Sequence, residues 1–591
     1  MQKRLFGILA SIVVIVAACG GATTTSAPPA GSIAPGASAS AGTESPAPSA
    51  ADLATDQILK IDLGTEPPTL DPNKAQDSTS IAVLHALNRG LVYFDKDLKI
   101  VPELAAALPV VSADAKTLTF TLKDGIKYSN GDPIVAGDFV YSMKRTIDPR
   151  TAAPYSYVMA EVAGAADLLA LAGKDPAPSD AEVDALMAKL GITAPDDKTL
   201  VINLSTPATY FTSVLALWIN VPVQEKWITS PNATEAANYV GSGPYILDTW
   251  NHNSQIVLKP NPNWSGETKS TLTEIQMSMT TEPAQGQAAY EAGDLDMVLT
   301  PSEDVQRVKA DPTLGPQVVE IPQLAITYYD FNNGIDPKTL KPFAACADLK
   351  KCPTMNKDFR IALTQAIDKK AFIDATFAAV GQPANSFVMP GIPGYQEDLD
   401  PYPFDLAAAK EHMTTALAAI GVASAADLGK LKFGFNSGSG HEPRVAFLAE
   451  AWRQAFGLET DQIGSDFSVF LTQRTAGDYQ LARDGWGADY PHANNQLGLF
   501  VCGGGNNDVQ YCNPEFDTLM SQAAGEADQD KQVALYNQAQ TILMNDAAFL
   551  PLRFGLTVYE VQPYVGGLTV TPSDSQLPGD KFYETIQMLK R

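Results

Sequence analysis

The sequence predicts a mixed α/β protein with two or three lobes. Apolar residues alternate with polar ones at Leu118, Phe120 and Leu122, and the segments 255–259 and 432–436 repeat this pattern, which is typical of half-buried strands. Other segments place apolar residues on one helical face between start and stop signals. Most of the 591 residues belong to this body, which is far too long for a single small domain.

Three segments carry clear helical signals. One begins after the cap Asn356, one runs from the cap Asp405 to a stop at Gly421, and one is centred near Ala539. Their apolar stripes are expected to face a core rather than a cofactor. The stripes are Phe359, Leu363, Ala366 and Ile367; Leu406, Ala409, Met413, Leu417 and Ile420; and Val533, Ala539, Ile542 and Leu543.

The N-terminus has the pattern of a bacterial lipoprotein signal. Lys3 and Arg4 precede an apolar run over 5–18, which is shorter than the ~20 residues that a membrane-spanning helix needs. Small residues lead to Cys19, whose thiol and new amino group can carry acyl chains. We therefore expect residues 1–18 to be cleaved and Cys19 to be the site of lipid attachment. The alternative is an ordinary signal peptide that happens to hold a cysteine.

A low-complexity segment follows the predicted cleavage site. Residues 19–54 are rich in Ala, Ser, Thr, Gly and Pro, and Glu44 is the only charged residue up to 51. Such a composition buries too little apolar surface to offset the entropy of ordering. It predicts a flexible tether that holds the folded body away from a membrane.

The formal net charge of -26 restricts the classes of partner. An acidic chain is poorly suited to nucleic acid and to docking on anionic lipid through basic patches. The acidic surface is most simply a solubility feature.

The cysteines agree with export from the cytoplasm. Apart from Cys19, four remain, and they form two close pairs, Cys346 with Cys352 and Cys502 with Cys512. An oxidising compartment allows both pairs to form disulfides, and the local pairing closes the shortest loops. The alternative is a cysteine-based metal site, but neither pair has CxxC spacing and no histidine lies near them in the sequence. No metal site is predicted.

Catalytic and cofactor motifs are absent from the sequence. It has no GxSxG, HExxH, GxxxxGK[ST] or GxGxxG pattern. The histidines are scattered, without the i, i+4 spacing of a metal site, at His85, His252, His412, His441 and His492. We expect no cofactor and no catalysis. The many Asp and Glu residues leave open a secreted hydrolase with a paired-carboxylate site.

Short segments over nearly the whole body form a recognisable series. The clearest are GTEPPTLDP at 64–72, YSNGDP at 128–133, GSGPY at 241–245, NPNW at 261–264 and GWGADY at 485–490. The others are 88–92, 118–125, 138–142, Glu291 with Gly293 and Asp296, and 359–368. In this order and at these spacings the chain resembles the extracytoplasmic solute-binding proteins of peptide and nickel importers, most closely their oligopeptide-binding members.

This resemblance implies a fold of the second periplasmic-binding class, with two lobes that close by a hinge and an inserted subdomain in the first lobe. It also implies a monomer that hands its ligand to an ABC permease, in the periplasm or at the cell surface. The implied limits are 55–90, 225–322 and 548–591 for lobe I, 91–224 for the inserted subdomain, and 323–547 for lobe II.

The resemblance also implies site residues. Asp489 matches the aspartate that accepts the free α-ammonium of a bound peptide, and Trp486 would form an apolar wall beside it. Tyr155 matches a tyrosine whose hydroxyl bonds the peptide backbone. The alternative is that Asp489 caps a turn and Trp486 belongs to the core.

Weaker correspondences concern the rest of the ligand. Arg474 and Arg483 match arginines that can meet a ligand carboxylate. Phe467 stands where a tryptophan is often found, and Gln76 stands where an acidic residue can occur, which puts the side-chain pockets and the peptide length in doubt. Family members also bind nickel complexes, haem or oligosaccharides, and a sugar could stack on Trp486. A structural surface lipoprotein, which binds no small molecule, is a further alternative.

Overall fold

The structure is a computed structural model that describes residues 52–591, apart from residues 172, 173, 175, 176, 281, 337, 338, 438, 439 and 505. The predicted signal peptide, the lipid attachment at Cys19 and most of the tether 19–54 lie outside the described residues. These three therefore stay predictions.

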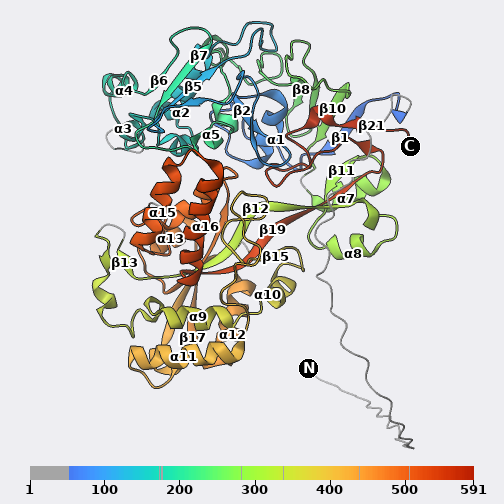
Figure 1. Ribbon diagram of the computed structural model, residues 1–591. Coiled ribbons are helices and arrows are strands. Elements are labelled where there is room, and N and C mark those ends of the chain that lie inside the picture. Colours follow the sequence, from blue (N-terminus) through green and yellow to red (C-terminus); the bar gives the residue numbers. More distant parts are fainter. Residues whose placement is uncertain are drawn as a thin grey trace, which may run out of the picture. The chain divides into compact units, whose positions relative to one another are not determined.

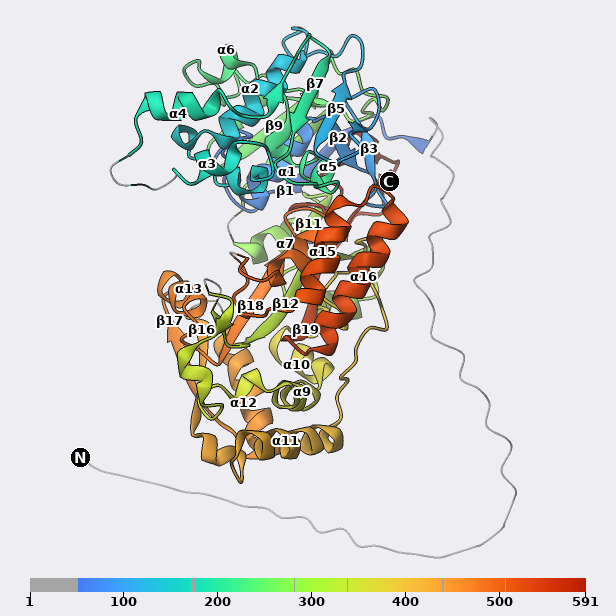
Figure 2. The same ribbon diagram turned by 60° about the vertical axis from the view of Figure 1, so that its left-hand side comes forward.

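One large mixed sheet runs through this part of the chain (Figures 1 and 2). Its 11 strands follow the order β17-β16-β18-β12-β19-β11-β1-β10-β9-β8, with β15 paired to β19. The strands are β1 Ile58–Asp62, β8 Tyr245–Asn251, β9 Gln255–Pro260, β10 Glu274–Ser278, β11 Met297–Leu299, β12 Val318–Phe331, β15 Gln382–Pro383, β16 Lys430–Asn436, β17 Glu459–Ser465, β18 Leu481–Gly487 and β19 Phe549–Val561.

The two longest strands, β12 and β19, join the two ends of this sheet (Figures 1 and 2). They pair antiparallel, with an irregular register where residues 323–325 lie opposite residue 555. A Cβ on Gly555 would lie 2.6 Å from Oε1 and 3.0 Å from Cβ of Gln323, so a larger residue there would require the Gln323 side chain to move. The irregularity in β12 lies next to residue 322, the predicted limit between lobe I and lobe II. In β19 the irregularity falls at residue 555, and residues 549–554 pair with the second half of β12.

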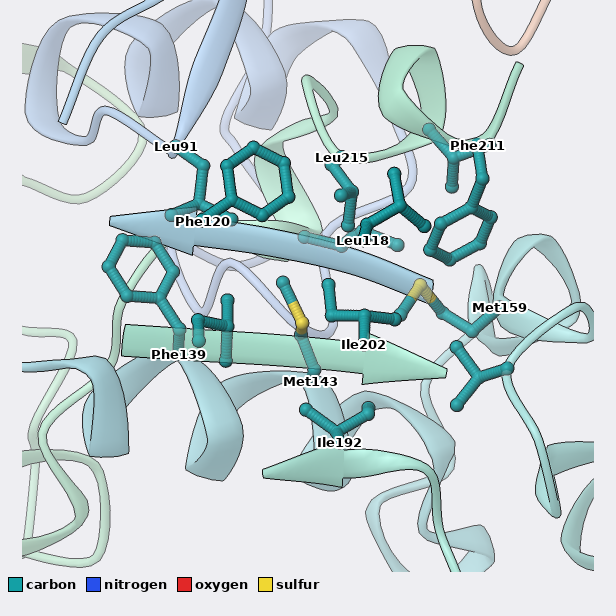
Figure 3. Close-up of a cluster of buried hydrophobic side chains, with 14 of the residues drawn as sticks. Leu91, Leu118, Phe120, Phe139, Met143, Met159, Ile192, Ile202, Phe211 and Leu215 are labelled. Atoms are coloured by element: carbon teal, nitrogen blue, oxygen red, sulfur yellow. The ribbon is translucent and has the colours of Figure 1, made fainter. Parts of the chain in front are cut away.

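A separate four-stranded sheet, in the order β4-β5-β7-β6, lies within residues 91–224. Its strands are β4 Val110–Val111, β5 Thr117–Thr121, β6 Ile192–Thr193 and β7 Thr199–Asn203. Leu118, Phe120 and Ile202 from this sheet pack with Phe139 and Met143 of helix α2, Ala136–Ile147 (Figure 3). Most residues of this core come from 91–224, and Trp264 and Tyr490 join it from other parts of the chain.

The segments predicted from periodicity fold as expected. The strand patterns become β5, β9 and β16. The helices are α9 Lys357–Gln365, α11 Leu406–Ile420 and α16 Gln529–Asn545. Asn356 and Asp405 accept backbone N–H bonds at the starts of α9 and α11, and Gly421 ends α11 with a φ of 82°. The α/β prediction is therefore confirmed.

Shorter elements complete the fold. The other helices are α1 Ser78–Leu87, α3 Ala165–Leu169, α4 Asp180–Met187, α5 Phe211–Val214, α6 Glu225–Ile228, α7 Pro283–Ala292, α8 Val305–Ala310, α10 Lys369–Thr376, α12 Glu442–Phe456, α13 Phe467–Thr475, α14 Ala493–Leu497 and α15 Pro514–Gly525. The other strands are β2 Val92–Phe94, β3 Ile100–Pro102, β13 Ile335–Asp336, β14 Lys341–Pro342, β20 Val565–Gly566 and β21 Gln587–Met588.

Two disulfides, Cys346–Cys352 and Cys502–Cys512, close short loops with the local pairing that the sequence predicts. No helix in the described ranges is both long and apolar enough to cross a membrane.

Substitution of Phe120 tests how much the core of the four-stranded sheet contributes to stability. Its side chain is fully buried, so we expect Phe120→Ala to lower the free energy of unfolding by about 3–5 kcal/mol through lost burial and a cavity. Val110 on the neighbouring strand β4 is 73% exposed, and Val110→Ala should change it by less than about 0.5 kcal/mol. Denaturant unfolding followed by circular dichroism measures both. Equal effects would contradict this description of the core.

Candidate ligand-binding site

A cavity of about 330 Å³ brings together parts of the chain that are far apart in sequence. Two predicted site residues, Tyr155 and Asp489, line it, together with Gln76. The irregular segment 323–325 of β12 also lines it, so a ligand in the cavity would touch the point where β12 and β19 change register. Its wall also includes residues 572–575 and Lys581, which come from the C-terminal part of the chain.

Asp489 follows the end of β18 and is held by the side chain of Asn495 on α14. Nδ2 of Asn495 donates to Oδ2 of Asp489 at 3.0 Å, and Oδ1 of Asn495 accepts from the backbone N–H of Asp489 at 3.1 Å. The hydroxyl of Tyr157 donates to the other carboxylate oxygen at 2.9 Å. These three bonds fix the direction of the carboxylate before any ligand arrives.

The carboxylate of Asp489 has no cationic partner among the residues that the structure describes. It forms no ion pair within the described part of the chain, and it is only partly exposed. Burial raises the pKa of Asp489, while hydrogen bonds from Asn495, Tyr157 and Tyr155 lower it. An ionised carboxylate that is partly buried without a cation is well suited to bind an ammonium group.

Aromatic rings surround this carboxylate on one side. The ring of Tyr155 packs edge-on against Trp218, with centroids 4.8 Å apart, and Trp218 also lines the cavity. Trp486 has a different position, because its half-buried ring packs against the core and its Nε1 donates to Oδ1 of Asn495 at 2.9 Å. Trp486 therefore supports the residue that holds Asp489, and the aromatic wall of the cavity comes from Trp218.

Arg474 is engaged in an internal network. Its guanidinium pairs with Asp484 at 2.5 Å and with Asp508 at 2.6 Å, and its side chain is only 12% exposed. It does not line the cavity. The structure therefore gives no support to the expectation that Arg474 meets a ligand carboxylate.

Arg483 is less constrained. Its Nε donates to Oδ1 of Asn436 at 2.6 Å, and its guanidinium lies 5.5 Å from the ring centroid of Phe467, which is 53% exposed. No ion pair involves Arg483 among the described residues. Arg483 and Phe467 thus form a pair that is separate from the cavity holding Tyr155 and Asp489.

Further cations close to Arg483 were not predicted from the sequence. The guanidinium groups of Arg444 and Arg553 lie 4.0 and 4.2 Å from the ring centroid of Phe377, and neither forms an ion pair within the described ranges. Nε of Arg444 is buried without an acceptor. Burial and the charges of Arg483 and Arg444 lower the pKa of His441 to about 4, which shows that positive charge is concentrated there.

A metal centre finds little support in the described residues. The one group with suitable spacing is Cys502, Cys512 and Asp517, and its two sulfur atoms are bonded to each other in a disulfide. A disulfide sulfur is not the thiolate that binds zinc.

Comparison with known proteins places the chain in a family. Residues 99–508 match the model for bacterial extracellular solute-binding proteins, family 5 Middle. The chain belongs to this family. One relative within it, the oligopeptide-binding protein OppA of Bacillus subtilis (strain 168), is 30% identical over 508 residues, which cover 84% of this chain and 87% of that protein.

Solved structures related to this family 5 protein share its fold. The unliganded open form of the periplasmic murein tripeptide binding protein MppA matches with a TM-score of 0.76 and 25% identity, covering 91% of this chain and 99% of that one. OppA of Haemophilus influenzae in complex with RPPGFSPFR matches with a TM-score of 0.65 and 27% identity, covering 91% and 100%. The predicted periplasmic-binding fold of class II is confirmed.

The raised pKa of Asp489 predicts how the stability of the ligand-free protein changes with pH. A folded-state pKa above the unfolded value of about 3.9 means that ionised Asp489 disfavours the folded state, so stability falls as pH rises from that value through the folded pKa. We expect Asp489→Asn to leave Tm unchanged or raise it at pH 7, with the difference shrinking toward pH 4. Thermal unfolding at several pH values measures this.

Asp71 is the matched control. It pairs with Arg145 at 2.6 Å and is largely buried, so Asp71→Asn should lower the free energy of unfolding by about 3 kcal/mol or more. If Asp489→Asn lowered Tm as strongly as Asp71→Asn, Asp489 would be a structural residue instead of a ligand-binding one.

Proposed function

We propose that this family 5 protein is the substrate-binding component of an ABC importer and captures peptides with a free amino terminus. The observation that carries the proposal is Asp489, a pre-oriented carboxylate without a cation in a cavity lined by aromatic and polar groups. The names of OppA and MppA, which describe oligopeptide and murein tripeptide binding, support a peptide as the ligand.

The peptide ammonium would bind Asp489 in place of water. Charge-assisted hydrogen bonds are roughly twice as strong as neutral ones, and partial burial reduces the competition from solvent. Tyr155 and Trp218 offer ring faces and a hydroxyl to the first part of the peptide chain. A ligand without a terminal ammonium would leave Asp489 buried and unpaired, so it should bind weakly.

The other end of the peptide would bind near Arg483. Arg483 and Asp489 are six positions apart, which is about 20 Å of extended chain. Up to about six extended residues would fit over that length. Arg444 and Arg553 pack on the ring of Phe377 and form no ion pair within the described ranges. They would attract the terminal carboxylate in place of Arg474.

The two lobes would close when a ligand contacts the segment where β12 and β19 change register. The segment 323–325 lines the cavity, and the carbonyl of Leu324 accepts the N–H of Ala488 at 2.7 Å, next to Asp489. We assign the hinge to 323–325 and Gly555, between lobe I with its inserted subdomain (91–224) and lobe II. A ligand that contacts both lobes would favour the closed form.

Export and anchoring complete the proposal. A lipid on Cys19 and the tether up to residue 54 would keep the protein, as a monomer, near its permease outside the cytoplasmic membrane. Binding and release need no cofactor and no bond cleavage, so we propose no catalytic activity.

A thermal-shift screen of the purified full-length chain tests the ligand class. Ligands that bind only the folded state raise Tm, by an amount that grows with concentration over Kd. We expect di- to hexapeptides to raise Tm by several degrees, and oligosaccharides, nickel and haem to leave it unchanged. Stabilisation by a sugar, nickel or haem alone would contradict the peptide assignment, and cleavage products in the peptide samples would favour a hydrolase.

A further inference from the structure

Lys581 lies in the wall of the cavity and takes no part in the proposed binding of the peptide termini. It lines the cavity of Asp489 and also a side pocket of about 40 Å³ that adjoins it. The two spaces also share His85, Phe94, Ala216, Leu217 and Trp218, so Lys581 lies on the boundary between them.

The ammonium of Lys581 lacks a direct partner. No ion pair within 4.0 Å and no side-chain hydrogen bond involves its Nζ in the part of the chain that the structure describes. Its Nζ lies 5.5 Å from the centroid of the Phe94 ring. Burial lowers the pKa of Lys581, which reflects the cost of holding a charge there.

The neighbouring carboxylates of Asp580 and Asp574 form no ion pair with Lys581 within 4.0 Å among the described residues, and both accept bonds from other groups. Asp580 accepts the backbone N–H groups of Ser575 and Gln576 and pairs with His85 at 3.1 Å. Asp574 accepts the N–H groups of Thr571 and Gly579. Their charges favour a protonated Lys581 from a distance, yet they leave its N–H groups available.

The side pocket has the size and polarity for a small anionic group. Its volume would hold a few water molecules or a carboxyl group, since one water needs roughly 10–15 Å³ of such space. Most of its wall is apolar, and its other cation, Arg89, already pairs with Glu584 at 2.9 Å. The apolar wall consists of Leu84, Val92, Phe94, Ala216, Leu217, Trp218 and Val221.

We infer that Lys581 and this side pocket form a specificity site for a carboxylate on a side chain of the ligand, near its amino terminus. The inference rests on the proposed function, because the position of the side chain is set by an ammonium bound to Asp489. An acidic side chain would place its methylene groups on the apolar wall and its carboxylate on the ammonium. A basic side chain would be repelled, and a neutral amide would bind less strongly.

The carboxylate of a short peptide's own C-terminus has the same chemistry. Arg483, Arg444 and Arg553 already offer a site for that terminus, so the side chain is the source that we assign to Lys581. Amidated peptides separate the two sources, because they keep an acidic side chain and lose the terminal charge.

The test measures Kd by calorimetry for Glu-Ala-Ala and Ala-Glu-Ala, for their Gln counterparts, and for amidated forms of all four, with the full-length chain. We expect one Glu peptide to bind about tenfold or more tightly than its Gln counterpart, amidated or not. Lys581→Met should remove this advantage and leave the Kd of the Gln peptides within about twofold. Lys370→Met, which changes an exposed lysine outside the cavity, should keep the advantage.

Four results would overturn the inference. Equal binding of the Glu and Gln peptides by the unchanged protein would contradict the inference and leave peptide capture intact. The same holds if the advantage of the Glu peptide survives in both Lys581→Met and Lys581→Gln. If amidation weakens the Glu and Gln peptides alike and Lys581→Met removes that loss, Lys581 binds the terminal carboxylate instead. If no peptide binds at all, the proposed function fails and the inference fails with it. Thermal unfolding of both Lys581 variants checks that they fold.

Discussion

The pairing of β12 with β19 is the constraint on which the rest of the structure depends. Each strand is long enough to take part in both ends of the large sheet, with β18 beside β12 and β11 beside β19. The pairing changes register at 323–325, where Gly555 leaves room for Gln323. Because these residues also line the cavity and bond the chain next to Asp489, ligand binding and the geometry of the sheet are linked there.

The distribution of ion pairs distinguishes charged residues that have partners inside the protein from the two to which we assign a role in ligand binding. Asp71 with Arg145, Arg89 with Glu584, and Arg474 with two aspartates are satisfied inside the protein. Asp489 and Lys581 line one cavity and have no ion pair in the described ranges. Keeping such groups partly buried costs stability in the free protein, and a complementary ligand would restore it.

The sequence predicts the local structure well, because its signals are local. Alternation at Leu118 to Leu122 and the caps Asn356 and Asp405 determine strands and helices within a few residues. The resemblance of GWGADY to a known motif singles out Asp489, and the structure places this residue in the wall of the cavity. The family comparison agrees with the predicted fold.

Other parts of the site depend on contacts that no local pattern reveals. Tyr157 is 332 residues away from the carboxylate to which it donates, and Lys581 reaches the cavity from the C-terminal region. Trp218 was not singled out, although its large ring faces the cavity while that of Trp486 packs into the core. The role of Arg474 depends on Asp484 and Asp508, whose proximity only the fold determines.

The central claim is that Asp489 binds the terminal ammonium of a peptide, and a double-mutant cycle measures that contact most directly. Calorimetry would compare one tripeptide and its N-acetylated form on the unchanged protein and on Asp489→Asn. We predict that acetylation weakens binding by about a hundredfold or more on the unchanged protein and by much less on the variant. The same loss on both proteins would show that Asp489 does not bind the ammonium and would contradict the account.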